Sequence, residues 1–182
     1  MVGRNVAGSR PVTTTTRPIA ADRPGDDVEQ WYRAHAPAVA RLIHGLTRDR
    51  DLTEDLVQET FVRATRAIGG YRGGEPRAWL LRIARTTTID HLRRRTEVPL
   101  GDELPPEVTR DADVAERLTV RAALARLSED HRTVLVLRDD LGLPHDEVAA
   151  ILDRKVGATR VLLHRARAAF ADAYRTEGGR VR

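Results

Sequence analysis

The sequence predicts an all-α protein of two small helical domains joined by an extended acidic linker. Of its 182 residues, 41% are hydrophobic and only 4% aromatic, so any core is aliphatic, which favours helices. Apolar residues recur at helical spacing on both sides of residues 96–112, a stretch rich in acids and proline. These observations predict domains over 27–95 and 113–176, with a disordered tail over 1–26 and a frayed end over 177–182.

The first domain is predicted to hold three helices. The first covers residues 28–47, although Pro37 and Gly45 predict a bend or a break in it. The second begins where either Asp51 or Thr53 can cap the first turn.

An apolar stripe follows along the second helix. Its residues recur three or four positions apart: Val57, Phe61, Ala64 and Ile68. Gly69 and Gly70 stop this helix, and after a short loop Pro76 suits the first turn of the third. The third helix is expected to end near Arg95.

Four more helices are predicted after the linker, over residues 114–127, 128–140, 144–152 and 156–174. Ser128, followed by two acids, is a good start for the second of these. The second domain is therefore expected to be a small helical bundle.

Asp55, Gln58 and Glu59 lie within little more than one turn of the second helix, largely off its apolar stripe. An acid and an amide exposed together could bind an arginine-rich surface of another protein. Solvation and the helix dipole are the plainer interpretation, and they account for Asp55 but not for Gln58. The three residues are therefore candidates for protein binding.

The charge reverses in the middle of the chain, although the formal net charge is only +4. Nine arginines and two acids lie within residues 63–95, whereas seven acids and one arginine lie within residues 97–116. Tyr71 and Trp79 stand in the basic stretch, and aromatic rings beside arginines suit the unstacked bases of single-stranded DNA. Trp79 could equally be part of the core.

A helix-turn-helix pattern covers residues 147–152, a turn over 153–155 and a helix over 156–167. Such a second helix can enter the major groove of DNA, and no acid occurs within residues 154–167. A solvated basic face on a small bundle is the alternative, and the basic entry to the helix favours DNA binding. The candidate contacts are Arg154, Lys155, Arg160, His164, Arg165 and Arg167.

The sequence contains no motif typical of a metal site, an enzyme, a membrane span or a secretory signal. The sequence has no cysteine, and none of its six histidines forms a metal-ligand pair such as H-E-x-x-H. No phosphate-binding loop or nucleophile motif occurs, so we expect no enzyme activity, no catalytic residue, no metal and no cofactor. No apolar run approaches the length of a membrane span and no secretory signal is evident, which predicts a cytoplasmic protein without membrane insertion.

Specific motifs in both domains resemble bacterial sigma factors of the sigma-70 superfamily. Three segments resemble region two: D-L-V-Q-E-T-F at 55–61, Y-R-G-G-E-P-R-A-W-L-L-R-I-A-R at 71–85 and I-D-H-L-R-R-R at 89–95. Two segments resemble region four: L-S-E-D-H-R-T-V-L-V-L-R at 127–138 and V-G-A-T-R-V-L-L-H-R-A-R at 156–167. Because both regions share one short chain with no third region between them, the chain resembles the extracytoplasmic-function (ECF) group.

The resemblance implies a dissociable sigma subunit that directs core RNA polymerase to promoters and helps to open the minus-ten element. Asp55, Gln58 and Glu59 match positions that meet the clamp helices of the largest polymerase subunit. The implied minus-ten contacts are Tyr71, Arg72, Trp79, Arg82, Thr86 and Arg93. The implied minus-thirty-five contacts are Arg154, Lys155, Arg160, Val161, His164, Arg165 and Arg167.

Further partners follow from the resemblance. They are the flap of the second polymerase subunit, promoter DNA and an anti-sigma factor, with a nucleoid-associated location when the chain is bound to polymerase. The acidic linker matches the segment threaded through the polymerase cleft toward the RNA exit path. A stand-alone helix-turn-helix regulator is the alternative, but it leaves the 55–61 surface and the aromatic–arginine helix without a role.

The chain departs from the family pattern at three places. Thr86–Thr88 stand where the family often has Asn followed by apolar residues, which predicts altered base capture. Pro144 replaces a usual Ser, so a side-chain helix cap is expected to be lost. Val161 and Leu162 replace a usual Ser and Arg, which predicts weaker or altered minus-thirty-five recognition.

Overall fold

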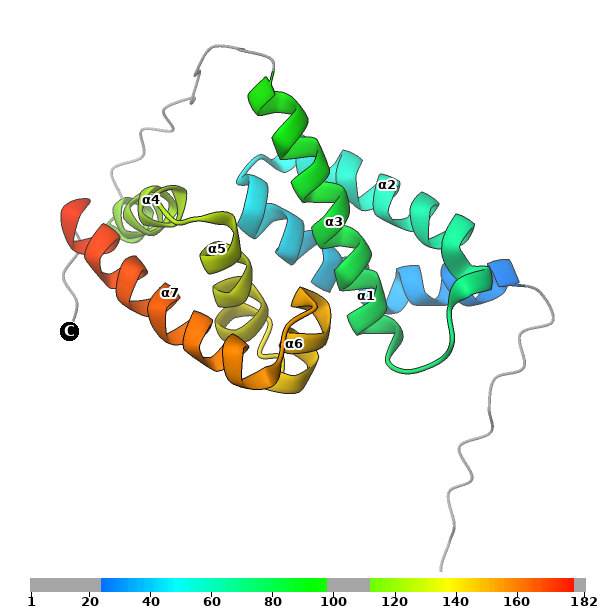
Figure 1. The fold of residues 1–182 in the computed structure, drawn as a ribbon. Coiled ribbons are helices and arrows are strands. Elements are labelled where there is room, and N and C mark those ends of the chain that lie inside the picture. Colours follow the sequence, from blue (N-terminus) through cyan, green and yellow to red (C-terminus); the bar gives the residue numbers. More distant parts are fainter. Residues whose placement is uncertain (1–23, 98–111, 179–182) are drawn as a thin grey trace, which may run out of the picture.

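The computed structural model describes residues 24–97 and 112–178, and every regular element within them is helical. The first domain comprises α1 (Pro24–Thr47), α2 (Arg50–Ala67), the 3₁₀ turn η1 (Ile68–Gly70) and α3 (Pro76–Glu97). The second comprises α4 (Ala112–Ala125), α5 (Glu129–Leu135), the π-helical turn η2 (Val136–Asp140), α6 (His145–Leu152) and α7 (Val156–Thr176). Figure 1 shows the two groups of helices beside each other. The predicted all-α class with two helical domains is confirmed, whereas most of the predicted tail and linker lies outside the described residues.

Helix α1 is one helix that starts at Pro24, four residues earlier than expected, and it continues across both Pro37 and Gly45. A proline inside a helix removes one backbone hydrogen bond. The buried face of α1 offsets that cost, because α1 packs against both α2 and α3. The fully buried residues of this face are Val39, Leu42, Ile43 and Leu46. Of the predicted bend or break, the break is therefore wrong, because tertiary burial keeps α1 continuous.

Helix α2 is capped by Asp49, so the expectation of a cap at Asp51 or Thr53 is wrong. The Asp49 carboxylate accepts a hydrogen bond of 3.0 Å from the Leu52 backbone N–H. Arg48 adopts a left-handed conformation with φ 56°, which reverses the chain after α1 and leaves Asp49 extended. Thr53 is instead buried in the first turn, where its hydroxyl donates to the Asp49 carbonyl at 2.5 Å.

The second domain starts its helices largely as expected. The Ser128 hydroxyl caps α5 by accepting from the His131 N–H at 3.4 Å, and the helix expected over 128–140 is α5 followed directly by the π-helical turn η2. Pro144 stands at the cap position of α6 without a side-chain hydrogen bond, which confirms the lost cap. Asp153 adopts a left-handed conformation with φ 53° and turns the chain from α6 into α7.

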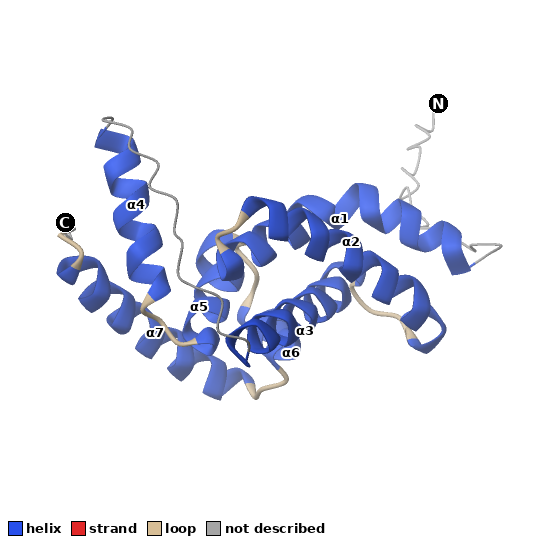
Figure 2. Ribbon diagram, turned by 90° about the horizontal axis from the view of Figure 1, so that it is seen from above, coloured by secondary structure: helices blue, strands red, loops and turns tan. Residues whose placement is uncertain are grey.

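The two domains pack on each other and share one continuous core cluster. Helix α3 contacts α6, while α1 contacts α5 and η2; the view from above in Figure 2 shows α3 and α6 side by side. Gly45 of α1 lies so close to η2 that an added Cβ would come 2.7 Å from Val136 Cγ2. None of the helices in the described ranges is both long enough and apolar enough to cross a bilayer.

Candidate protein and nucleic-acid interfaces

Helix α2 has one exposed face, which carries the predicted acid–amide surface, and one buried face. Asp55 and Gln58 are exposed, whereas Leu56 and Val57 beside them are buried. The Glu59 carboxylate lies 2.6 Å from the Arg63 guanidinium, which is also 3.5 Å from Asp90 of α3. Asp55 and Gln58 are therefore the more open part of the predicted protein-binding surface.

A groove between α1 and α2 extends this surface. It is lined by Tyr32, Ala36, Pro37, Ala40, Thr53, Glu54, Val57 and Gln58. The Tyr32 ring is 44% exposed and packs edge-on against Phe61 with a centroid distance of 4.8 Å. The sequence reasoning missed the contribution of α1, although Tyr32, an aromatic residue five positions before Pro37, could have indicated it.

Tyr71 and Trp79 form an aromatic cluster with Trp31 of α1. The three ring centroids are 4.9 to 5.8 Å apart, and the Tyr71 hydroxyl donates to the Gly74 carbonyl at 2.7 Å. Trp79 is half-buried and packs against the core, so it contributes to packing, as the alternative interpretation held. The cluster fixes the loop before α3, and Trp31 is the member that the sequence reasoning left out of the site.

The polar residues of α3 differ in what they contact. Arg72, in the loop before the helix, and Arg93 are exposed, and Arg93 lies 4.0 Å from Asp90. Arg82 is exposed but its guanidinium donates to the Ala150 carbonyl of α6 at 2.6 Å. Arg85 is half-buried and lies 3.4 Å from Asp130 of α5.

The three consecutive threonines of α3 are not equivalent. Thr86 is exposed and its hydroxyl donates to the Arg82 carbonyl at 3.1 Å, whereas Thr87 and Thr88 are fully buried. The Thr88 hydroxyl donates to the Ala84 carbonyl at 2.8 Å, and the Thr87 hydroxyl has no hydrogen-bond partner. Thr86 is therefore the exposed member of the triplet, while its predicted contact with the minus-ten element stays a prediction.

Helix α7 presents a basic exposed face. Lys155, Arg160, His164 and Arg165 are exposed, and the Val161 side chain among them is 51% exposed. Leu162 instead packs partly buried against the core, so it does not occupy a contact position on this face.

Two of the predicted DNA contacts are already paired within the chain. The Arg154 guanidinium forms an ion pair with Asp130 of α5. Both nitrogens of the Arg167 fork bind the Asp139 carboxylate, at 3.0 and 2.5 Å, and these hydrogen bonds raise the pKa of Arg167 above its ordinary value. Within the described residues, no three His, Cys, Asp or Glu side chains gather where they could hold a metal ion.

Comparison with known proteins assigns both domains. Residues 31–98 match the family described as Sigma-70 region 2, and residues 117–170 match Sigma-70, region 4. The chain is 33% identical over 156 residues to the ECF RNA polymerase sigma factor SigE of Mycolicibacterium smegmatis, covering 79% of this chain and 60% of SigE. It is 31% identical over 154 residues to the RNA polymerase sigma factor YlaC of Bacillus subtilis, covering 78% of this chain and 88% of YlaC.

A solved structure agrees with these matches. CnrH, solved in complex with the cytosolic domain of CnrY, shares 28% identity with a TM-score of 0.64, over 81% of this chain and 87% of CnrH. One chain with this fold therefore carries the helix-turn-helix (α6 and α7), the exposed face of α2 and the aromatic–arginine helix α3. The chain belongs to the extracytoplasmic-function group of the sigma-70 family, non-enzymatic initiation factors that direct RNA polymerase to promoters.

Proposed function

We propose that this chain binds core RNA polymerase through α2 and reads promoter DNA through α3 and α7. The observation that carries the proposal is the exposed acid–amide face of α2, because a factor that only bound DNA would have no use for it. Asp55 and Gln58 are exposed beside the groove that Tyr32 lines. They suit an arginine-rich surface, which we propose the clamp helices present, since carboxylates and amides form charge-assisted hydrogen bonds with guanidinium groups.

For the minus-ten element, the proposed contacts lie on α3 and the loop before it. Tyr71 and Arg72 stand in that loop, followed by Trp79, Arg82, Thr86 and Arg93 on the helix. The rings of Tyr71 and Trp79 offer a stacking surface for an unpaired base, while the arginines neutralise phosphates. Thr86 supplies a short hydroxyl where a base would be held.

For the minus-thirty-five element, α7 is the proposed reader. The entry residue Lys155 and the exposed side chains of Arg160, His164 and Arg165 present hydrogen-bond donors suited to base edges and phosphates. Val161 offers only an apolar contact, such as with a thymine methyl group. Arg154 and Arg167 complete the proposed contacts once they leave their carboxylate partners.

A second polymerase contact is proposed for an apolar groove between α4, α5, η2 and α7. Its apolar lining is Val120, Leu124, Leu135, Val136 and Phe170, with Asp139 and Asp140 at its rim. This lining suits an apolar segment with basic flanks, and we assign it to the flap of the second polymerase subunit. CnrH was solved with a domain of another protein bound, and we propose that an anti-sigma factor similarly binds this chain.

Transcription in vitro tests the proposal. Core RNA polymerase from the same bacterium is mixed with the purified chain and transcribes fragmented genomic DNA, and the 5′ ends of the transcripts are sequenced. We expect a small set of start sites that share upstream elements and are absent with core polymerase alone. Start sites that do not change on adding the chain would contradict the function.

A further inference from the structure

A cavity of about 640 Å³ lies between the C-terminal end of α1 and α4, and none of its lining residues is a proposed DNA contact. Three arginines line it, here called the cavity arginines: Arg48 directly after α1, and Arg117 and Arg121 of α4. Sites for small molecules typically have volumes of about 300–1,000 Å³. The cavity is therefore large enough for a ligand of nucleotide size.

Two of the cavity arginines are held beside each other by reciprocal hydrogen bonds. The Arg48 guanidinium donates to the Arg121 carbonyl at 2.6 Å, and the Arg121 guanidinium donates to the Arg48 carbonyl at 2.7 Å. A guanidinium carries several N–H donors, so each side chain keeps donors for a further partner. Because both groups are already ordered, a ligand that binds them meets a smaller entropic cost.

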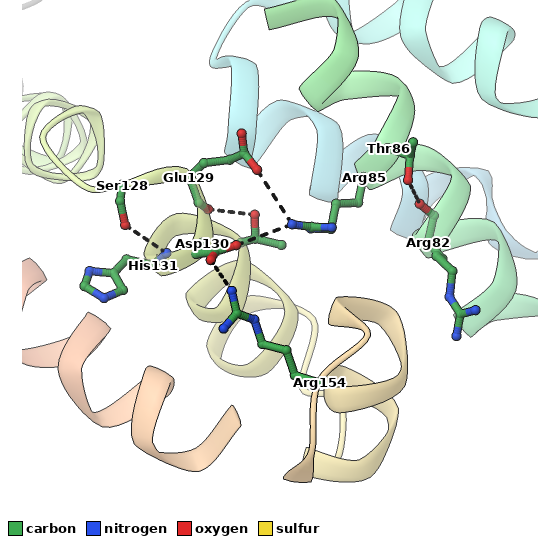
Figure 3. Close-up of polar contacts among 9 residues, drawn as sticks. Arg82, Arg85, Thr86, Ser128, Glu129, Asp130, His131 and Arg154 are labelled. Atoms are coloured by element: carbon green, nitrogen blue, oxygen red, sulfur yellow. Dashed lines mark hydrogen bonds and ion pairs between the residues drawn. The ribbon is translucent and has the colours of Figure 1, made fainter. Parts of the chain in front are cut away.

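No carboxylate neutralises the cavity arginines. Elsewhere arginines pair with acids, and Figure 3 shows Arg85 and Arg154 converging on Asp130. None of the ion pairs formed within residues 24–97 and 112–178 involves a cavity arginine. Glu116 is the one acid among the lining residues, and it is exposed. The cavity therefore carries an excess of positive charge.

Arg48 is a half-buried cation with like charges around it. Burial, followed by the nearby charges of Arg132 and Arg121, lowers the pKa of Arg48 to about 10. Arg132 of α5 is itself bound to the Leu46 carbonyl at 3.0 Å. An anion placed among these guanidinium groups offsets their repulsion and accepts charge-assisted hydrogen bonds from them. The electrostatics of the cavity therefore favour an anionic ligand.

The uncharged part of the lining favours an organic ligand over a bare ion. Val120 and Leu124 give the cavity an apolar wall, and Gly45 lines it without a side chain. The exposed ring of His44 adds a further group that can form hydrogen bonds. An apolar lining with a few polar groups that orient the ligand is the usual composition of a small-molecule site.

We propose that this cavity binds a small organic phosphate, and that a nucleoside di- or triphosphate is the ligand that matches its size and charge. The phosphates lie among the cavity arginines, and the base or sugar packs against Val120 and Leu124. This site goes beyond the proposed function and does not depend on it, because the cavity arginines take no part in the proposed contacts with polymerase or DNA.

Calorimetric titration of the free, full-length chain tests the proposal, with ATP, GTP, pyrophosphate and adenosine as probes. We expect saturable binding of ATP or GTP, weaker binding of pyrophosphate and no binding of adenosine. Absence of nucleotide binding at about 1 mM overturns the site. Pyrophosphate bound as tightly as the nucleotides overturns the organic part of the proposal.

Two variants of the lining should change nucleotide affinity in opposite directions. The Arg117 side chain makes neither a hydrogen bond nor an ion pair within the described residues, so Arg117→Gln preserves the fold. We expect it to weaken binding at least about tenfold, because a charge-assisted hydrogen bond is lost. Glu116→Gln removes the acid of the lining, and we expect it to tighten binding about threefold.

Matched controls separate this site from general attraction to a basic protein. Arg66→Gln removes an exposed arginine of α2, and Glu75→Gln removes an exposed acid before α3. Both should bind nucleotide like wild type, and circular dichroism checks that every variant is folded. Equal affinities of the Arg117→Gln and Arg66→Gln proteins would overturn the inference while leaving the proposed function intact, because no polymerase or DNA is present.

Discussion

Asp55 is the residue on which the proposed polymerase contact most depends. Its side chain is exposed on α2, so reversing its charge leaves the buried face of the helix unchanged. We expect Asp55→Arg to weaken core polymerase binding at least about tenfold, or about 1.4 kcal/mol, with an unchanged helical circular dichroism spectrum. Asp172→Arg on α7 makes the same charge change away from the proposed surface and should bind normally. A folded Asp55→Arg protein with wild-type affinity would remove the clamp assignment.

Within α7, Val161 is the departure from the family pattern whose side chain is exposed. Leu162 packs against the core, so an arginine there would disturb the domain rather than add a contact. Val161→Ser places one hydroxyl on the exposed face of α7, and we expect it to shift the minus-thirty-five preference by about 1 kcal/mol at one base pair. Binding to duplexes that vary at each position of this element measures the shift. An identical preference profile would mean that Val161 does not face the bases.

Helix starts show where local sequence signals suffice and where they do not. Ser128 and Pro144 stand at the cap positions that the sequence predicted, because the acids or apolar residues after them mark the first turn. Asp49 was missed because the left-handed conformation of Arg48 sets the end of α1, and an arginine carries no local signal for that conformation. Four acids lie within seven residues, at 49, 51, 54 and 55, and propensity alone cannot rank them as helix caps.

The cap of α2 can be tested by stability. Asp49→Ala removes the hydrogen bond to the Leu52 N–H, and we expect the free energy of unfolding to fall by about 1 kcal/mol. Asp51→Ala, an exposed residue of the first turn, loses only a dipole interaction of about 0.3–0.5 kcal/mol. Urea denaturation followed by circular dichroism measures both values. A larger loss for Asp51→Ala would restore the cap predicted from sequence.

The packing of the two domains was not predictable from periodicity. Apolar spacing identifies the buried face of each helix, and it correctly placed Val57, Phe61 and Ala64 in the core. The partners of Arg82 and Arg85 lie 68 and 45 residues away along the chain, and nothing in the local pattern of α3 points to them. The sequence therefore predicted which side chains are basic and exposed, but not that the second domain already holds several of them.

The distribution of arginines predicts a steep salt dependence of promoter binding by the holoenzyme. Each phosphate neutralised releases counterions, so log K should fall linearly with log salt concentration, and removing one phosphate contact should reduce the slope by about 1. We expect Arg165→Ala, which removes an exposed charge of α7, to show that reduction. Arg175→Ala, in the last turn of α7, is the matched control. A flat salt response in wild type would show that the arginine faces do not touch DNA.

Arg48 links the two functional faces of the molecule thermodynamically. It reverses the chain directly before α2, and its guanidinium binds the Arg121 carbonyl of α4. A partner that moves α2 on binding therefore changes the stability of the contact with α4. By linkage, separating α4 must change the affinity for that partner by the same factor. Binding of such a partner to α2 and separation of α4 are then linked by one coupling free energy, to which the left-handed Arg48 contributes.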